Sequence, residues 1–385
     1  MTSGFATAEG TARYRDRFPQ LRDAQHFRRP EWVPDLAELS LSSIGAGTYL
    51  GEPDDDADRA YTAAIAEALR SGVNVADTAI NYRHQRSERN IGAALAELIA
   101  AGQLQRDEVL VCSKAGYLTF DADMPADPRA YFVKEYVDPG ILDPAEIAGG
   151  MHCMAPRFLA DQIERSRKNL GLETIDVFYL HNPETQLASV PPSDFVERLT
   201  AAFAELEKAA AEGKIRWYGV ATWNAFRVQP NAPGYMPLEA VVQCAFEAGG
   251  EGHHFSFIQL PFNLAMPEAW AANNQQFEND AISALEFAHR YGIAAIGSAT
   301  LAQGQLAQQL PDFVTKRLGM KTAAENAIQF ARSAPGIVTA LVGMGRPEHV
   351  KADLAVASHP PAEVEQWRGL FRAPPKSAQP HGSNS

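Results

Sequence analysis

The sequence predicts a single-domain (β/α)8 barrel of the TIM type. Eight short apolar segments each precede a segment with helical periodicity, which is the pattern of parallel strands joined by helices. Many of the apolar segments are hydrophobic throughout rather than at alternate positions, as expected for strands that are covered on both faces. The 385 residues are enough for a barrel with insertions. Eight units in one chain favour the closed barrel over an open sheet.

The first unit is a strand at 41–47 followed by a helix over 56–71. In this helix Tyr61, Ile65 and Leu69 share one apolar face. The other seven units, each a strand followed by its helix, are expected at 73–79 and 86–101, 108–116 and 155–170, 174–181 and 194–212, 215–222 and 237–248, 255–262 and 279–291, 293–299 and 321–333, and 336–343 and 347–357.

Two connections are unusually long, at 117–154 after the third strand and at 224–236 after the fifth. Both follow the carboxyl end of a strand, where barrel enzymes build their active sites. Loops of this length are commonly functional. We therefore expect 117–154 to form a lid over the active site.

The barrel is expected to occupy residues 39–372. Residues 1–38 are polar and rich in arginine, and we expect them to be an extension lying on the surface of the barrel. Residues 373–385 are rich in proline and serine and are expected to be disordered.

Composition narrows the function classes. The formal net charge of −13 would repel a nucleic acid. The apolar runs are too short for a membrane span, and the first residues lack the apolar core of a secretory signal. Three scattered cysteines, Cys112, Cys153 and Cys244, indicate a reducing compartment without a disulfide framework. We therefore expect a cytoplasmic protein whose partner is a small molecule.

Polar residues follow three neighbouring strands where each strand ends. Asp77 ends the second strand, Tyr82 follows it, Lys114 ends the third and His181 ends the fourth. A single such residue is commonly a cap or a surface charge, but four at adjacent strand ends point to a catalytic group. Lys114 can lower the pKa of Tyr82, and Asp77 can keep Lys114 protonated. Tyr82 could then donate a proton to a carbonyl oxygen that His181 orients, which suits hydride addition to a carbonyl.

No metal site is predicted. His152 and Cys153 belong to the long loop above the barrel mouth, whereas His253 and His254 precede the sixth strand and lie at the opposite end. The two pairs therefore cannot share a metal ion. His152 is instead a candidate contact for substrate, with a loop histidine bonded to the backbone as the simpler alternative.

Several motifs together resemble the aldo-keto reductase family over about residues 41–357. They occur in the family's order, on the expected elements: G-x-G-T-Y (45–49), D-T-A-x-x-Y (77–82), S-E-x-x-I-G (87–92), S-K-A-G (113–116), I-D-V-F-Y-L-H-N-P (175–183), G-K-I-R-x-x-G-V (213–220), Q-L-P-F-N (259–263), L-A-Q-G-Q-L (301–306) and P-G-I-V-T-A-L-V-G (335–343).

The resemblance implies Tyr82 as acid/base, with Asp77, Lys114 and His181 as its partners. It also implies a nicotinamide cofactor, expected to be NADP with NAD as the alternative. The residues it places along the cofactor are Gly47, Thr48, Asp77, Asn182, Thr222, Gln259, Ser298, Leu301, Gly304, Gly343, Arg346 and His349. Tyr49, His152 and Trp223 are the candidate substrate contacts.

The chain departs from the family pattern at four places. Ala221 and Thr222 stand where Ser-Asn is common, and Ser298 stands where an aromatic ring is common. Asp353 replaces a common asparagine, and Gly345 replaces a frequent basic residue. These departures put preference for the 2′-phosphate of NADP in doubt, because anion contacts then rest on Arg346, with Lys316 or Arg317 as further candidates.

The leading function is reduction of an aldehyde or ketone by NADPH, or oxidation of the alcohol. One alternative is a redox-neutral epimerase or lyase that retains its nicotinamide cofactor. Another is a non-catalytic binding module. The mixture of charged and aromatic residues in 117–154 is compatible with a sugar derivative as substrate.

Overall fold

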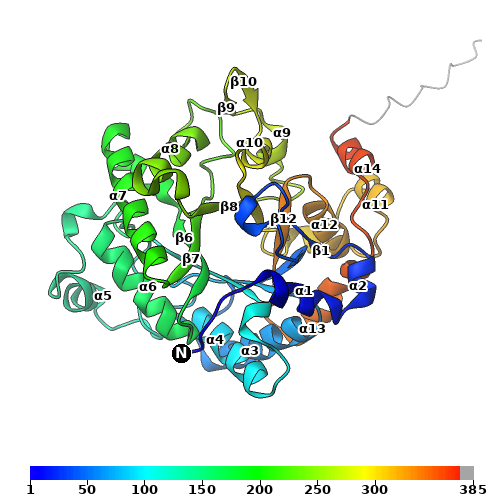
Figure 1. The fold of residues 1–385 in the computed structure, drawn as a ribbon, viewed down its shortest axis with the longest axis horizontal. Helices are drawn as coiled ribbons and strands as arrows, with labels where there is room; N and C mark the ends of the chain where they lie inside the picture. The colour runs from blue at the N-terminus through cyan, green and yellow to red at the C-terminus, as the bar shows by residue number, and fades with distance from the viewer. Residues whose placement is uncertain (373–385) are drawn as a thin grey trace, which may run out of the picture.

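Eight parallel strands close into a barrel, which confirms the predicted fold (Figure 1). The computed structural model describes residues 1–372. Around the barrel each strand pairs with the next, and β8 pairs with β11 to complete the ring. The strands are β3 (Ile44–Gly47), β4 (Val75–Asp77), β5 (Leu110–Ala115), β6 (Ile175–His181), β7 (Ile215–Ala221), β8 (Phe255–Pro261), β11 (Ala294–Ser298) and β12 (Ile337–Gly343).

One main helix follows each strand and packs outside the barrel. Side-chain caps mark the starts of some of them: before α3, Asp54 accepts a hydrogen bond from the Ala57 amide, and at the start of α12, Thr322 and Glu325 form a capping box. The helices are α3 (Asp55–Arg70), α4 (Arg86–Ala100), α6 (Pro156–Leu170), α7 (Pro192–Ala211), α8 (Leu238–Gly249), α10 (Ala284–Tyr291), α12 (Ala323–Arg332) and α13 (Pro347–Leu354). Within residues 1–372 we find no helix long and apolar enough to cross a membrane.

Alternation along each strand separates the interior from the helix layer. In β5, Cys112 packs in the apolar cluster inside the barrel. Lys114 lies two residues further along the strand and therefore points to the same side. Ser113 has the opposite parity and donates a hydrogen bond to Glu88 of α4. The same alternation places Asp77, His181 and Gln259 inward at the carboxyl ends of their strands. The barrel therefore brings polar side chains from distant parts of the chain together at one end.

The helix expected at 279–291 begins later than predicted. Residues 280–282 form β10 (Asp280–Ile282), which pairs with β9 (Gln275–Phe277) as a hairpin. Ser283 then caps α10 by accepting a hydrogen bond from the amide of Glu286. Three further short helices lie between the main elements or after them: α9 (Glu268–Ala271), α11 (Asp312–Leu318) and α14 (Val364–Arg368).

Residues 1–38 do more than lie on the surface of the barrel. They form α1 (Ala8–Asp16), α2 (Pro19–Asp23) and β1 (Phe27–Arg28), which pairs with β2 (Leu41–Ser42). Ala6, Val33 and Leu36 pack against the inward apolar residues of the strands. The segment therefore closes the amino end of the barrel. Residues 373–385, expected to be disordered, lie outside the described residues.

The long segment 117–154 does not cover the barrel mouth, so the predicted lid is wrong. It contains α5 (Pro128–Phe132), a π-helical turn (Val133–Val137) and a short 3₁₀ turn (Pro144–Glu146). Tyr136, Leu142 and Cys153 pack against Phe158 of α6 in a separate apolar cluster. Arg165 of α6 also pairs with Glu135 at 2.7 Å.

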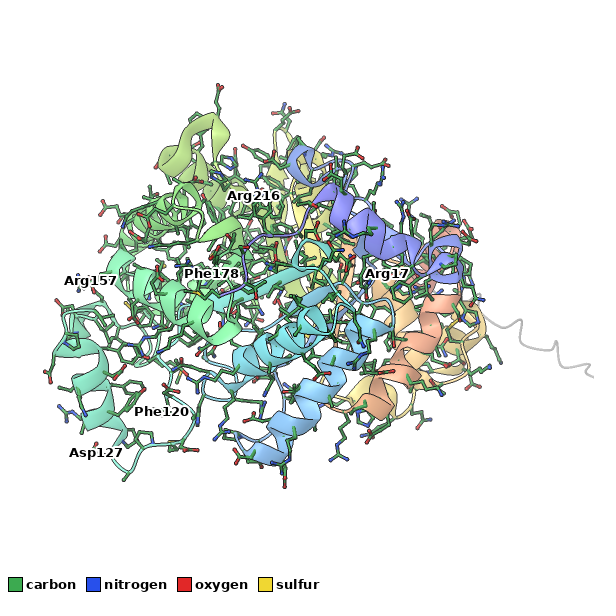
Figure 2. All side chains as sticks on the ribbon, turned by 60° about the horizontal axis from the view of Figure 1, so that its bottom comes forward. Arg17, Phe120, Asp127, Arg157, Phe178 and Arg216 are labelled. Carbon is green, nitrogen blue, oxygen red and sulfur yellow. The ribbon has the colours of Figure 1, made fainter. Side chains whose placement is uncertain are left out.

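Both general views agree on where this segment lies. In Figure 1, α5 stands at the outer edge beyond α6, and Figure 2 shows Phe120 and Asp127 on the same excursion of the chain, apart from the strands. The segment has enough aromatic residues to bury against one another, so it forms its own small core beside the barrel.

Candidate active site

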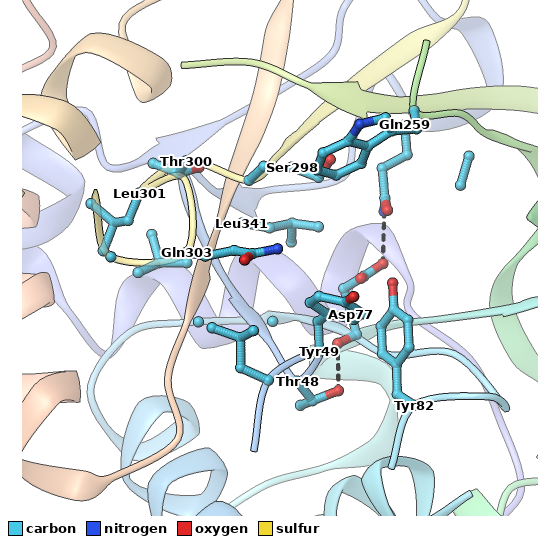
Figure 3. A pocket seen from close by; sticks show the side chains of 18 of the residues that line it. Thr48, Tyr49, Asp77, Tyr82, Gln259, Ser298, Thr300, Leu301, Gln303 and Leu341 are labelled. Atoms are coloured by element: carbon cyan, nitrogen blue, oxygen red, sulfur yellow. Dashed lines mark hydrogen bonds between the residues drawn. The ribbon is translucent and has the colours of Figure 1, made fainter. Parts of the chain in front are cut away.

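A cavity of about 730 Å³ opens at the carboxyl ends of the strands. It runs from the loop after β4 across the barrel mouth to α12 and α13. Figure 3 shows part of its lining, with Tyr82, Asp77 and Gln259 at one side and Leu301 and Gln303 at the other. The position agrees with the general placement of active sites on this fold.

Asp77 is the centre of a hydrogen-bond network at the inner end of the cavity. Its Oδ1 accepts from Lys114 Nζ at 2.5 Å, and its Oδ2 accepts from Gln259 Nε2 at 2.7 Å (Figure 3). Lys114 Nζ also donates to the backbone oxygen of Thr78 at 2.7 Å. Three residues from β4, β5 and β8 are therefore fixed relative to one another.

Burial and charge compete in the Asp77–Lys114 pair. Burial raises the pKa of Asp77, against the lowering effect of Lys114 and Gln259. Burial would lower the pKa of Lys114, but Asp77 and Tyr82 raise it, and the net shift is upward. Lys114 therefore remains an ammonium group although its side chain is fully buried.

Tyr82 lies against this pair and against two aromatic rings. Lys114 Nζ is 5.0 Å from the centre of the Tyr82 ring, and the ring centres of Tyr49 and His181 lie at 5.1 and 5.8 Å. Burial raises the pKa of Tyr82, and the charge of Lys114 offsets this in part. The sequence predicted a lowered value. The effect of Lys114 has the predicted direction, but burial outweighs it.

His181 is a neutral imidazole in this environment. Burial lowers its pKa well below the ordinary value, and the charge of Lys114 acts in the same direction. Its Nδ1 atom is buried without a hydrogen-bond partner, and its ring packs edge-on against Tyr82 and Tyr117. A neutral ring that faces the cavity can orient a polar ligand without repelling the ammonium group of Lys114.

The cavity also contains unpaired polar atoms suited to an amide-bearing ligand. Thr222 Oγ1 and Thr300 Oγ1 are buried without partners, and Asn182 follows His181 directly in a left-handed conformation with φ 45°. These residues line the same cavity as Gln259 and Ser298. The residues present therefore fit the nicotinamide cofactor that the sequence implied.

Of the predicted cofactor residues, all but one line the cavity. Those that do are Gly47, Thr48, Asp77, Asn182, Thr222, Gln259, Ser298, Leu301, Gly304, Gly343 and His349. Arg346 does not, because it is the exposed residue that precedes α13. The placement of Arg346 along the cofactor stays a prediction.

Two of the three predicted substrate residues stand at the mouth of the cavity. Tyr49 and Trp223 line it and are 58% and 45% exposed. His152 does not, because it is fully buried behind His181. Its Nε2 lies 2.8 Å from the His181 backbone oxygen, and its Nδ1 lies 2.9 Å from Gln186 Nε2. The prediction that His152 contacts substrate is therefore wrong, and the simpler alternative holds.

The tautomer of His152 follows from these neighbours. Gln186 Oε1 accepts from Arg198 at 2.7 Å, so its amide nitrogen faces His152 Nδ1. Nδ1 is then the acceptor, and Nε2–H donates to the His181 carbonyl. Gly116 allows the close approach, since a Cβ there would lie 2.7 Å from His152 Nε2.

Besides Thr300, sequence reasoning missed four polar or aromatic residues of the lining. Asn81, whose Oδ1 is buried without a partner, directly precedes Tyr82, and Tyr117 directly follows the S-K-A-G motif. Gln303 lies within the L-A-Q-G-Q-L motif, and Asp353 lies on α13. The neighbouring motifs could have indicated the first three. Asp353 stood out as a departure, but no role was assigned to it.

Within residues 1–372 we find no cluster of three or more histidine, cysteine, aspartate or glutamate side chains that could hold a metal ion.

Comparison with known proteins agrees with the resemblance noted in the sequence. The model of the Aldo/keto reductase family matches residues 43–370. The chain is 27% identical over 197 residues to the NADH-specific methylglyoxal reductase of Escherichia coli K12, covering 50% of this chain and 52% of that protein. It is 28% identical over 204 residues to the D-threo-aldose 1-dehydrogenase of a Pseudomonas species, covering 48% and 51%. The matched regions are thus about half the length of these relatives.

Solved structures share the fold over most of the chain. An aldo/keto reductase from Klebsiella pneumoniae, in complex with NADP and acetate, gives a TM-score of 0.55 at 19% identity and covers 86% of this chain and 91% of that one. An aldo-keto reductase from Bacillus halodurans in its holo form gives 0.58 at 18% identity, covering 90% and 95%. Together with the family match over residues 43–370, these likenesses show that the chain belongs to the aldo/keto reductase family.

Proposed function

We propose that the chain is a nicotinamide-dependent oxidoreductase that reduces an aldehyde or ketone, or oxidises the corresponding alcohol. The observation that carries the proposal is the network in which Lys114 and Gln259 hold the two oxygens of Asp77 beside Tyr82. The names of relatives support it, since one is a methylglyoxal reductase and another an aldose dehydrogenase.

Tyr82 is the proposed acid/base. In the reductive direction its Oη donates a proton to the carbonyl oxygen while hydride adds to the carbonyl carbon. Lys114 stabilises the phenolate that remains, and Asp77 keeps Lys114 protonated. In the oxidative direction the phenolate accepts the proton from the alcohol.

His181 is the proposed orienting group. Being neutral, it can donate a hydrogen bond to the carbonyl oxygen, and negative charge grows on that oxygen as hydride arrives. Its backbone oxygen accepts from His152, and its ring packs between Tyr82 and Tyr117, so the imidazole is held in place.

A bound nicotinamide would supply the hydride. We propose that Asn182, Thr222 and Gln259 hold its carboxamide end, and that Ser298 and the loop from Leu301 to Gly304 lie along the remainder of the cofactor. Tyr49 and Trp223, at the mouth of the cavity, would then form an aromatic wall for the substrate.

Cofactor binding and turnover test this proposal together. Titration of the purified chain with NADH and with NADPH should quench tryptophan fluorescence, since Trp223 lines the cavity. A panel of small aldehydes, ketones and aldoses should then consume the bound dihydronicotinamide. If neither cofactor binds at millimolar concentration, the proposal is wrong. Interconversion of a substrate without net consumption of cofactor would instead support a redox-neutral enzyme.

A further inference from the structure

The outer end of the cavity, where it reaches α13, differs in charge from a typical phosphate site. Gly343, His349 and Asp353 line this end, with Ala324 of α12 opposite. Among the residues that line the whole cavity, all of them within 1–372, none is a lysine or an arginine. The ionisable groups at the outer end are therefore one imidazole and one carboxyl.

Asp353 is a buried carboxyl that has no compensating partner. It is 8% exposed and lies on α13 facing the cavity. Burial raises its pKa to about 7, with no offsetting contribution from a cation or a hydrogen-bond donor among the described residues. A buried carboxyl without a donor loses its hydration and forms no hydrogen bond that would compensate for the loss. A ligand that brings a hydroxyl group to this position would supply the missing partner.

The arginine nearest to Asp353 in the sequence does not line the cavity. Arg346 is exposed and precedes the first turn of α13. Gly345 beside it has no side chain to contribute, and a Cβ there would lie 3.3 Å from the Tyr61 ring. The cavity wall at this end therefore lacks a cation that could neutralise a phosphate.

The two nicotinamide cofactors differ at one position of the adenosine ribose. NAD(H) has a 2′-hydroxyl there, which can donate a hydrogen bond to a carboxylate. NADP(H) has a 2′-phosphate, which carries about two negative charges at neutral pH and needs cationic partners. Beside a carboxylate the phosphate is repelled, because like charges placed together cost binding free energy.

We propose that the chain uses NAD(H) in preference to NADP(H), and that Asp353 is the residue that determines this specificity. The inference rests on the proposed function, since it takes the cavity to be the cofactor site. With the nicotinamide held at the inner end by Asn182 and Gln259, the adenosine ribose would lie at the outer end beside Asp353. The inference departs from the expectation of NADP, which rested on the family resemblance and on Arg346.

The test compares dissociation constants for NADH and NADPH by fluorescence quenching, in a buffer free of phosphate. The wild-type chain should bind NADH at least about tenfold more tightly than NADPH. Asp353→Asn should reduce this ratio to about threefold or less, mainly through tighter binding of NADPH. Asp353→Ser is the second variant, should the asparagine chain fail to fold.

Glu348→Gln is the matched control. Glu348 is an exposed carboxylate on the same helix and outside the cavity lining, so its removal changes the net charge equally. The ratio should stay at the wild-type value in this variant. A similar change in both variants would mean that the effect is one of overall charge, and would overturn the assignment to Asp353.

Three other outcomes would also overturn the inference. One is equal or tighter binding of NADPH by the wild-type chain. Another is an unchanged ratio in both Asp353 variants. The third is a loss of NADPH affinity alone in Arg346→Ala, which would assign the 2′-phosphate to Arg346. Binding of neither cofactor has a different meaning, because it would refute the proposed function on which the inference rests.

Discussion

The two ends of the cavity are built in different ways. At the inner end, Asp77, Lys114 and Gln259 come from three strands and bond to one another. At the outer end, Gly343, His349 and Asp353 come from one strand end and the helix that follows it, and Asp353 is without a partner. The inner end is fixed by closure of the barrel, whereas the outer end depends on one local element.

Because of this difference, a substitution should affect more of the molecule at the inner end of the cavity than at the outer end. A substitution at the inner end affects several strands and the reacting groups at once. A substitution at the outer end affects one helix and, on our proposal, the choice of cofactor. The predictions that follow test this separation, beginning with the largest expected effect.

Tyr82→Phe should lower kcat by about 10²–10⁴-fold, because general acid catalysis is worth about that much. The change removes one hydroxyl and keeps the ring, so cofactor affinity should stay within about threefold of wild type. Single-turnover hydride transfer, with cofactor titration in parallel, measures both. A wild-type rate in this variant would refute the proposed mechanism whatever the substrate.

Lys114→Met should lower activity and also destabilise the fold by about 3–5 kcal/mol, because it leaves Asp77 as an uncompensated buried charge. The double variant Asp77→Asn/Lys114→Met should recover much of this stability but none of the activity. Urea unfolding and single-turnover kinetics separate the two effects. Equal stability of the single and double variants would show that Asp77 does not depend on Lys114.

Asp353→Asn should stabilise the chain at high pH. In the wild type the pKa of Asp353 is raised to about 7 by burial. The unfolded chain releases this proton near pH 4, whereas the folded chain keeps it until about pH 7. Folding stability therefore falls as pH rises from about 4 to 7, by up to about 4 kcal/mol in total.

In Asp353→Asn, folding stability should not decrease in this way as pH rises. Its free energy of unfolding should exceed that of the wild type at pH 8 by more than it does at pH 5, as measured by urea titration. Glu348→Gln again serves as the control, because its carboxylate is exposed. A constant difference between variant and wild type at the two pH values would contradict the raised pKa.

His152→Phe should have the smallest effect on chemistry. It removes the ring nitrogens that bond to Gln186 Nε2 and to the His181 carbonyl, which should cost about 1–3 kcal/mol of stability. Because His152 does not line the cavity, the order of preference among substrates should not change. A changed order of preference among substrates would indicate that His152 contacts substrate after all, which the structure contradicts.

Much of the fold and of the inner end could be predicted from the sequence. Strand and helix periods identify the eight units, and inward residues at strand ends must meet when the barrel closes. That is why the sequence alone could predict that Asp77, Lys114 and His181 lie together. The side of the strand on which each residue lies and its position at the strand end were sufficient for this placement. Neither feature depends on loop conformation.

What could not be predicted depends on packing outside the strands. The segment 117–154 has the length of a lid, but whether its aromatic residues pack inward or against α6 is decided by contacts such as that between Tyr136 and Phe158. Arg346 and Asp353 lie on the same short stretch, and only the orientation of α13 determines which of them faces the cavity. The pKa of Tyr82 required the depth of burial, which the sequence does not contain.

The closed amino end of the barrel has a consequence for synthesis of the chain. The amide of Thr2 donates to the Gly171 oxygen at 2.7 Å, and the amide of Ala6 donates to Asp176 Oδ1 at 2.6 Å, across a separation of 170 residues. At ordinary elongation rates the ribosome needs roughly 10–30 s to add that many residues. During this interval Thr2 and Ala6 lack these two partners, so their amides stay in water. The segment that closes the barrel is thus accessible to proteases and chaperones until the fourth barrel strand, β6, has been made.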